Sequence, residues 1–168
     1  MDEEKLTCCF SGHRPSKLPW GHDETDPRAL RLKDELDAHI EGLYIAGCRN
    51  FICGMAMGCD MYFAEAVLKL REAHSDVTLE AAVPCTEQSE RWTGSYRARY
   101  DALLSECDEV TFLQHSYTRD CMNRRNRYMV DRSDVLLTCY DGQPGGTMNT
   151  ILYAERRGLK VIIVNITE

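Results

Sequence analysis

Three apolar segments in this 168-residue chain each end in a polar loop that contains glycine. The junctions are Leu6–Phe10 before Ser11–Pro15, Asn50–Cys53 before Gly54–Asp60, and Asp134–Cys139 before Tyr140–Thr147. A strand that passes through a glycine loop into a helix leaves backbone N–H groups unpaired at the helix start, where a phosphate or carboxylate can bind. A tight turn explains each loop equally well when it is considered alone. Three such junctions in one chain predict a single ligand site lined by several loops.

Side chains in these loops suit a phosphate-bearing or sugar-bearing ligand. Arg14 can bind a phosphate through two parallel hydrogen bonds, and Thr147 can either bind a phosphate or cap a helix. His13 can hydrogen-bond a ligand or act as an acid or base, while Asp60 can bind a ribose hydroxyl or act as a general base. Each also has a structural alternative, such as a surface arginine or a carboxylate that stabilises a helix start. The ligand-binding candidates are Ser11, Gly12, His13, Arg14, Gly54, Gly58, Asp60, Asp141, Gly145, Gly146 and Thr147.

The sequence does not single out a catalytic residue, and the two candidates are Asp60 and Glu65. Glu65 lies within the helix that follows Asp60, which favours a structural role or a ribose contact. None of the five histidines pairs with another at positions i and i+4, and the chain has no Cys-x-x-Cys pair, so no metal site and no cofactor are expected. Trp92 and Tyr117 can stack on a base, although packing is the favoured interpretation of both.

Six strand-like segments alternate with helical patterns along the chain. The strands are predicted at 6–10, 50–53, 77–83, 109–113, 134–139 and 160–165. This alternation predicts an α/β fold of the Rossmann-like type, a three-layer sandwich in which helices cover both faces of a mostly parallel sheet. The expected strand order is 3-2-1-4-5-6. Loops 11–14, 54–60, 86–92, 115–117 and 141–147 are then expected to converge at the carboxyl edge of the sheet.

The first helix has the clearest start signal. Asp26 is a good N-cap and Pro27 suits the first helical position. The apolar face of this helix is predicted to contain Leu30, Leu36, Ile40, Leu43 and Tyr44, and Gly47 is predicted to end it.

Length and composition predict one globular domain over residues 1–168, with 43% hydrophobic and 28% charged residues. No apolar run reaches the roughly 18 residues of a membrane span, and the acidic start Met1–Lys5 is no secretory signal. A cytoplasmic location is therefore expected, with no membrane partner. The nine cysteines are odd in number and several lie in strand-like runs, which favours reduced thiols that pack as small hydrophobes.

The formal net charge of −7 disfavours nucleic acid as a partner, because domains that bind the phosphate backbone are usually basic. One segment is an exception. Five arginines lie between positions 119 and 132, at 119, 124, 125, 127 and 132. They form either a solvated helix face or a patch that meets an anionic ligand.

The order and spacing of the motifs resemble the YpsA-like family of the SLOG superfamily, which includes the Smf/DprA and LOG proteins. The motifs are Phe10–Pro15 (FSGHRP), Gly54-x-x-x-Gly58-x-Asp60, Ala64–Ala66 (AEA), and Tyr140–Gly142 followed by Gly145–Thr147. The resemblance covers nearly the whole chain. It implies a Rossmann-like domain that binds a nucleotide or a nucleotide derivative.

The resemblance also suggests that activities of related proteins be considered for this chain. LOG proteins are phosphoribohydrolases with the signature Pro-Gly-Gly-x-Gly-Thr-x-x-Glu, whereas this chain reads PGGTMNT from Pro144 to Thr150. The carboxylate that would face the oxocarbenium-like transition state is thus absent from that position, and Asp60, Glu65 or Asp141 would have to supply one. DprA relatives bind single-stranded DNA, which the acidic charge and the lack of an evident aromatic platform disfavour here.

The sequence therefore predicts a module that binds a nucleotide-like small molecule at the C-terminal edge of the sheet. Its role is predicted to be that of a sensor that passes the ligand state to a protein partner. The alternatives are a nucleotide N-glycoside hydrolase and a binder of single-stranded DNA. The length of the chain is compatible with a homo-oligomer.

Overall fold

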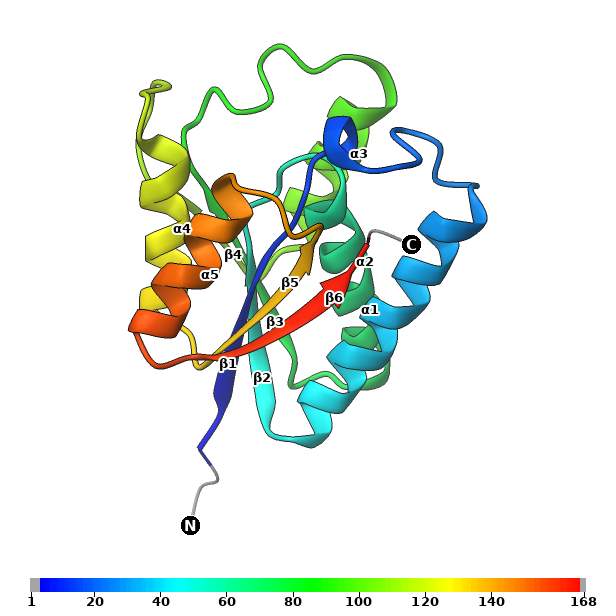
Figure 1. Ribbon diagram of the computed structural model, residues 1–168, viewed down its shortest axis with the longest axis vertical. Helices are drawn as coiled ribbons and strands as arrows, with labels where there is room; N and C mark the ends of the chain where they lie inside the picture. The colour runs from blue at the N-terminus through cyan, green and yellow to red at the C-terminus, as the bar shows by residue number, and fades with distance from the viewer. Residues whose placement is uncertain (1–3, 167–168) are drawn as a thin grey trace.

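The computed structural model describes residues 4–166, which fold into a six-stranded parallel sheet between two layers of helices (Figure 1). The strands are β1 (Leu6–Ser11), β2 (Cys48–Cys53), β3 (Thr78–Val83), β4 (Glu109–Phe112), β5 (Val135–Tyr140) and β6 (Lys160–Asn165). The helices are α1 (Pro27–Ile45), α2 (Cys59–Ala73), α3 (Gly94–Glu106), α4 (Cys121–Asp131) and α5 (Gly146–Arg156), with a short 3₁₀ helix at Pro15–Lys17. The predicted α/β Rossmann-like fold is confirmed. Within this described part of the chain, no helix combines the length and apolar character that a bilayer crossing requires.

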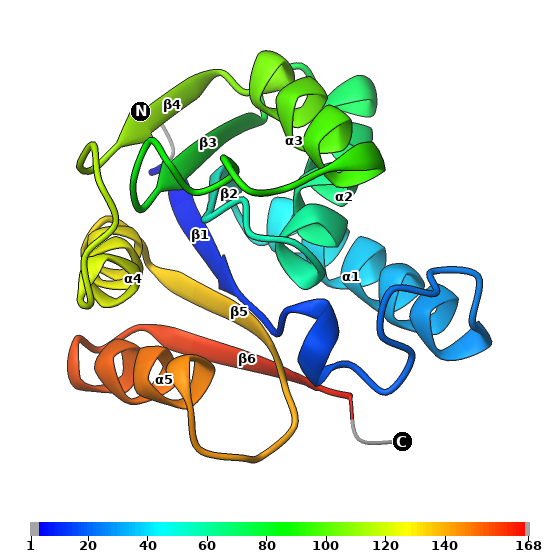
Figure 2. The ribbon, with the colours of Figure 1, turned by 90° about the horizontal axis from the view of Figure 1, so that it is seen from above.

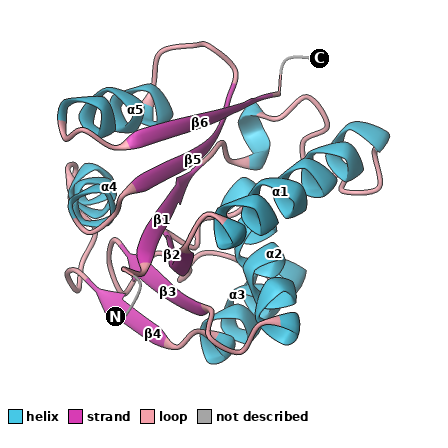
Figure 3. Cartoon of the chain, turned by 90° about the horizontal axis from the view of Figure 1, so that it is seen from below, coloured by secondary structure: helices cyan, strands magenta, loops and turns pink. Residues whose placement is uncertain are grey.

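The strand order is β4-β3-β2-β1-β5-β6, so the predicted order 3-2-1-4-5-6 is wrong. β4 extends the sheet beyond β3, and β5 takes the place beside β1. Helices α1, α2 and α3 lie on one face as the chain moves outward from β1, and the chain then returns over the other face through α4 (Figures 2 and 3). Right-handed crossovers permit both strand orders. The hydrophobic pattern of the sequence does not indicate on which side of the sheet's existing strands the next strand is added.

The observed order still creates a crevice at the carboxyl edge of the sheet. The connection after β1 leads to one face and the connection after β5 leads to the other. Two neighbouring strands with diverging connections form the switch point at which open α/β sheets bind ligands.

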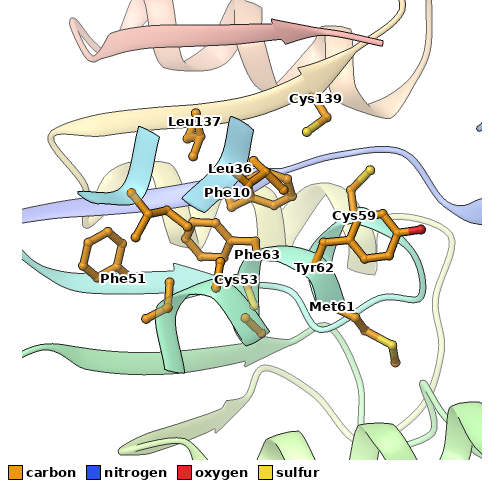
Figure 4. Close-up of a cluster of buried hydrophobic side chains, with 14 of the residues drawn as sticks. Phe10, Leu36, Phe51, Cys53, Cys59, Met61, Tyr62, Phe63, Leu137 and Cys139 are labelled. Atoms are coloured by element: carbon orange, nitrogen blue, oxygen red, sulfur yellow. The ribbon is translucent and has the colours of Figure 1, made fainter. Parts of the chain in front are cut away.

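The larger core fixes the end of β1 against α2. Phe10 of β1 stacks on Phe63 of α2 with ring centroids 4.6 Å apart, and Phe51 of β2 lies 6.2 Å from Phe63 (Figure 4). All three side chains are fully buried. Burying an aromatic side chain of this kind contributes about 1.5–3 kcal/mol, so this contact holds the two segments that lead into the crevice.

Helix α1 begins where the sequence predicts. Asp26 accepts a hydrogen bond of 2.8 Å from the backbone N–H of Arg28, and Pro27 occupies the first turn. The prediction for Leu30 is wrong, because this side chain is 50% exposed. Leu32 and Leu36 follow the inward face at helical spacing, and Leu30 lies well off that face.

All nine cysteines are free thiols, and only Cys107 is not fully buried. Burial raises the pKa of the Cys9 thiol to about 12. These thiols pack as small apolar side chains, as predicted.

Candidate functional site

A cavity of about 270 Å³ lies at the carboxyl edge of the sheet, where the loops after β1 and β2 meet α4 and α5. We call it the switch-point cavity. Its lining residues are Phe10, Ser11, Gly12, His13, Arg14, Ser16, Lys17, Ala56, Asp60, Met122, Arg125, Asn126, Met129, Gly146 and Thr147. Seven of the predicted ligand-binding residues are in this set: Ser11, Gly12, His13, Arg14, Asp60, Gly146 and Thr147.

The N-terminus of α5 opens onto the switch-point cavity. Gly145 is the N-cap, and no side chain caps the helix. Gly145 has φ +154°, and a Cβ atom at this position would lie 2.9 Å from the ammonium nitrogen of Lys17. The first turn of α5 has no acidic residue, so its N–H groups and its dipole remain available to an anion.

Arg125 provides a buried cation in the same cavity. Its side chain lies on α4 and is only 6% exposed. Nη1 donates a hydrogen bond of 2.8 Å to the backbone oxygen of Gly54, and Nε donates one of 2.9 Å to Oδ1 of Asn126. A Cβ atom at Gly54 would lie 2.1 Å from Nη1, so the guanidinium can pack here only because residue 54 is glycine. Gly54 thus supports the cavity without lining it.

From the sequence alone, Arg125 is grouped with the other arginines of its helix, and its burial at the cavity is not predicted. Its spacing holds the signal that could have found it. Arg125 lies four residues after Cys121 and four residues before Met129, both of which are buried. Three residues at this spacing share one helix face, so Arg125 belongs to the inward face of α4.

Asp60 places a carboxylate in the same cavity. It is 5% exposed, and Oδ2 accepts a hydrogen bond of 3.1 Å from the backbone N–H of Ala56. Burial raises the pKa of Asp60, although the positive charges of Arg125 and Arg14 oppose this effect. No cation within residues 4–166 forms an ion pair with it. The carboxylate of Asp60 can therefore still accept a hydrogen bond from a ligand hydroxyl.

Gly12 and Gly58 allow the β1 loop to pack closely on the start of α2. Gly58 has φ +91°, and a Cβ atom there would lie 2.8 Å from the backbone oxygen of His13. A Cβ atom at Gly12 would lie 2.7 Å from Cβ of Cys59. The structure thus gives Gly58 a packing role, and Gly12 both packs and lines the cavity.

His13 joins the loops after β1 and β5. Its Nε2 lies 3.0 Å from Oδ1 of Asp141, and its Nδ1 lies 3.4 Å from Oγ1 of Thr147. His13 is 5% exposed and Thr147 is 7% exposed. Asp141 is therefore connected to the cavity through His13, although it does not line the cavity itself.

Several predicted residues lie elsewhere. Glu65 forms an ion pair with Arg99 of α3, outside the cavity. Loops 86–92 and 115–117 do not line the cavity either, and Glu87 accepts a hydrogen bond from the backbone N–H of Tyr117. Trp92 packs edge-on against Tyr100 with ring centroids 5.1 Å apart. These loops follow β3 and β4, which lie far from the β1–β5 crevice in the observed strand order.

Sequence comparison places this chain within a known family. The YpsA family model, described as the YspA SLOG family, matches residues 8–160. An uncharacterised prophage-derived protein of Bacillus subtilis, YoqJ, is 30% identical over 144 residues, which cover 78% of this chain and 84% of that protein.

Solved structures share the fold. DNA processing protein A (DprA) from Streptococcus pneumoniae has a TM-score of 0.65 at 13% identity and covers 95% of this chain, which spans half of that DprA chain. DprA from Helicobacter pylori, whose structure was described for its binding of single-stranded DNA, has a TM-score of 0.62 at 15% identity; 94% of this chain and 64% of that chain are covered. With a family match over nearly its whole length and the shared fold of these relatives, this chain belongs to the YpsA family of SLOG proteins.

Proposed function

We propose that the switch-point cavity binds a nucleotide or nucleotide-derived ligand through its phosphate, and that the protein acts as a sensor of this ligand. The observation that carries the proposal is that the uncapped N-terminus of α5 and the buried guanidinium of Arg125 belong to one cavity. Arg14 and Lys17 add two more cations at the cavity wall. This is a concentration of positive charge on a chain whose net charge is −7. An anion is the ligand that such a site stabilises.

The remaining polar groups suit the sugar of a nucleotide. Asp60 offers a carboxylate to ribose hydroxyls on the α2 side of the cavity, opposite the α5 helix start. Ser11 adds a hydroxyl at the end of β1. A phosphate at α5 and a sugar near Asp60 would together span the cavity.

Thermal unfolding against nucleotides, nucleotide sugars, ADP-ribose and NAD tests the proposal. A ligand at about 100 times its dissociation constant should add roughly 2.7 kcal/mol of stability, which at this chain length raises the unfolding temperature by about 5–11 °C. Arg14→Ala and Lys17→Ala should each weaken binding roughly 10- to 100-fold, because each removes a charge-assisted hydrogen bond. Arg156→Ala is the matched control, since it removes a cation from the far end of α5. Failure of every compound to shift unfolding would contradict the proposal.

The position of Asp60 favours a second candidate function, a nucleotide N-glycoside hydrolase. Of the three carboxylates considered for this reaction, Asp60 lines the cavity, whereas Glu65 and Asp141 do not. A carboxylate near the ribose can stabilise an oxocarbenium-like transition state. The test is the appearance of free base and ribose phosphate from a nucleotide. Asp60→Asn should abolish turnover and leave the thermal shift in place.

A third candidate, binding of single-stranded DNA, is favoured by the arginines on α4 and α5. Arg127 and Arg156 line a second cavity of about 560 Å³ between these helices, and Asn126 lines both cavities. The negative net charge of the chain therefore does not describe the local charge of this surface, which contains these arginines. DNA binding would weaken steeply with salt and would be reduced by Arg127→Ala and Arg156→Ala. Binding that is flat in salt and unaffected by these two changes would exclude this candidate.

A further inference from the structure

A hydroxyl, an imidazole and a carboxylate are connected in series at the wall of the switch-point cavity. Oγ1 of Thr147 lies 3.4 Å from Nδ1 of His13, and Nε2 of His13 lies 3.0 Å from Oδ1 of Asp141. The three residues come from α5 and from the loops after β1 and β5, so the fold rather than local sequence brings them together. Nucleophilic hydroxyls in enzymes are activated by this kind of arrangement.

The carboxylate determines which imidazole nitrogen carries the proton. Burial tends to raise the pKa of Asp141, but the backbone N–H of Gln143 and the imidazole of His13 more than compensate and lower it, so this carboxylate is ionised at neutral pH. An ionised carboxylate only accepts hydrogen bonds, so Nε2 of His13 must donate to it. The backbone N–H of Asp141 donates a hydrogen bond of 3.3 Å to the same nitrogen, so this position of the proton requires the shorter, charge-assisted contact with the carboxylate to be the stronger of the two. Nδ1 is then left as an acceptor that faces the hydroxyl of Thr147.

Thr147 also lies where a phosphate would bind. It is in the first turn of α5, lines the cavity with Gly146, and shares the cavity with the buried Arg125. A phosphoryl group bound at the helix start would lie next to Oγ1, in a cavity that also contains the positive charge of Arg125. Positive groups around a phosphate stabilise the charge that its oxygens carry during phosphoryl transfer.

We propose that Thr147 is a nucleophile that accepts a phosphoryl group from the bound ligand, with His13 as its general base and Asp141 as the residue that positions His13. The inference rests on the proposed function, because it requires a phosphate in the switch-point cavity. The Oγ1 proton passes to Nδ1 of His13, an Oγ1–P bond forms, and the bond from phosphorus to the leaving oxygen breaks. His13 then protonates the leaving oxygen.

Water completes the cycle. A water oxygen bonds to phosphorus while His13 takes one water proton, and the Oγ1–P bond breaks. Oγ1 recovers a proton from His13, and inorganic phosphate leaves. No oxidation or reduction occurs in either half of the reaction.

Orthovanadate and sulfate test the inference without knowledge of the leaving group. Monomeric orthovanadate becomes five-coordinate when an oxygen nucleophile bonds to it, as phosphorus does during transfer, whereas sulfate stays tetrahedral. The wild-type protein should bind orthovanadate at least about 100-fold more tightly than sulfate, as measured by the dependence of the unfolding temperature on anion concentration. Thr147→Val should lose this preference and still bind sulfate, and Thr147→Ser should keep it. Thr138→Val is the matched control, because Thr138 is a buried threonine on β5 that does not line the cavity.

The outcomes separate the inference from the proposed function. Equal binding of the two anions by the wild type, or a preference for vanadate that survives in Thr147→Val, would overturn the nucleophile while leaving the anion site in place. Asp141→Asn should reduce the preference for vanadate more than the affinity for sulfate, which a purely structural role would not produce. Binding of neither anion by the wild type would overturn the phosphate site and the inference with it.

Discussion

At the scale of single residues, the cavity contains groups that cost stability in the absence of a ligand. Asp60 carries a buried carboxylate whose pKa is raised by burial. Arg125 carries a buried guanidinium whose pKa is lowered by burial. Burying two charges that do not form an ion pair with each other lowers the stability of the folded protein. We therefore expect these two residues to serve ligand binding at the expense of stability.

Asp60→Asn and Asp141→Asn should therefore change stability in opposite directions at neutral pH. Burial raises the pKa of Asp60, so its contribution to stability is fully present below the unfolded pKa and is lost as pH rises through the folded value. Asp60→Asn should then stabilise the ligand-free protein at pH 7. The pKa of Asp141 is lowered, because hydrogen bonds from Gln143 and His13 outweigh its burial, and Asp141→Asn should destabilise the protein at pH 7.

Urea unfolding of both variants at pH 7 and near pH 4 measures these effects. The difference for Asp60→Asn should shrink at the lower pH, because the raised pKa of Asp60 lets the wild-type carboxylate become protonated there. The difference for Asp141→Asn should persist near pH 4, because the lowered pKa of Asp141 keeps its carboxylate ionised in the folded protein. A destabilised Asp60→Asn at pH 7 would show that Asp60 has a structural role, in conflict with its assignment to ligand binding.

Two buried threonines give a second prediction at this scale. Oγ1 of Thr138 is fully buried and has no hydrogen-bond partner, whereas Oγ1 of Thr150 donates a hydrogen bond of 2.9 Å to the backbone oxygen of Gly146. Thr138→Val should be neutral or stabilise the protein by about 1 kcal/mol, and Thr150→Val should destabilise it by about 0.5–1.5 kcal/mol. Urea unfolding compares the two directly, and equal effects would contradict the assigned hydrogen bonding.

At the scale of elements, the start of α5 is the most informative part of the fold. The sequence predicts a strand, a glycine loop and a helix here, and the structure confirms all three between Val135 and Arg156. They can be predicted because glycine and proline punctuate a strong apolar pattern. The contact of Lys17 with Gly145 could not be predicted, because it depends on how two loops distant in sequence pack together.

Gly146→Asp tests the electrostatics of this helix start. A Cβ atom added at Gly146 would meet no heavy atom within 4 Å, and this residue lacks a left-handed φ, so a side chain is sterically tolerated there. A carboxylate in the first turn should stabilise the ligand-free protein by about 0.3–1 kcal/mol through the helix dipole.

The same substitution should abolish stabilisation by any phosphate-bearing ligand, because the new carboxylate occupies or repels the anion position. Gly146→Asn is the neutral control of matched shape, and thermal unfolding with and without ligand measures both variants. Full ligand stabilisation of Gly146→Asp would place the anion elsewhere.

At the scale of the whole molecule, strand order decides which loops can meet. The six strands and the two helical layers are predictable from the sequence, because periodicity and alternation are local signals. The position of β4 is not predictable in this way. The sequence therefore also fails to predict that loops 86–92 and 115–117 lie outside the cavity. Helical spacing can place Arg125 on the inward face of α4, but its contact with Gly54 cannot be predicted, because Gly54 is far away in the sequence.

Amide hydrogen exchange gives the most direct test of the central claim that the ligand phosphate binds at the start of α5. The ligand to use is the compound that shifts thermal unfolding most, and the amides to follow are those of Gly146, Thr147 and Met148. These N–H groups belong to the first turn of a helix that lacks a side-chain cap, so they should exchange quickly in the free protein and slowly in the complex. Protection confined to the second cavity between α4 and α5, with no change at these three amides, would contradict the account.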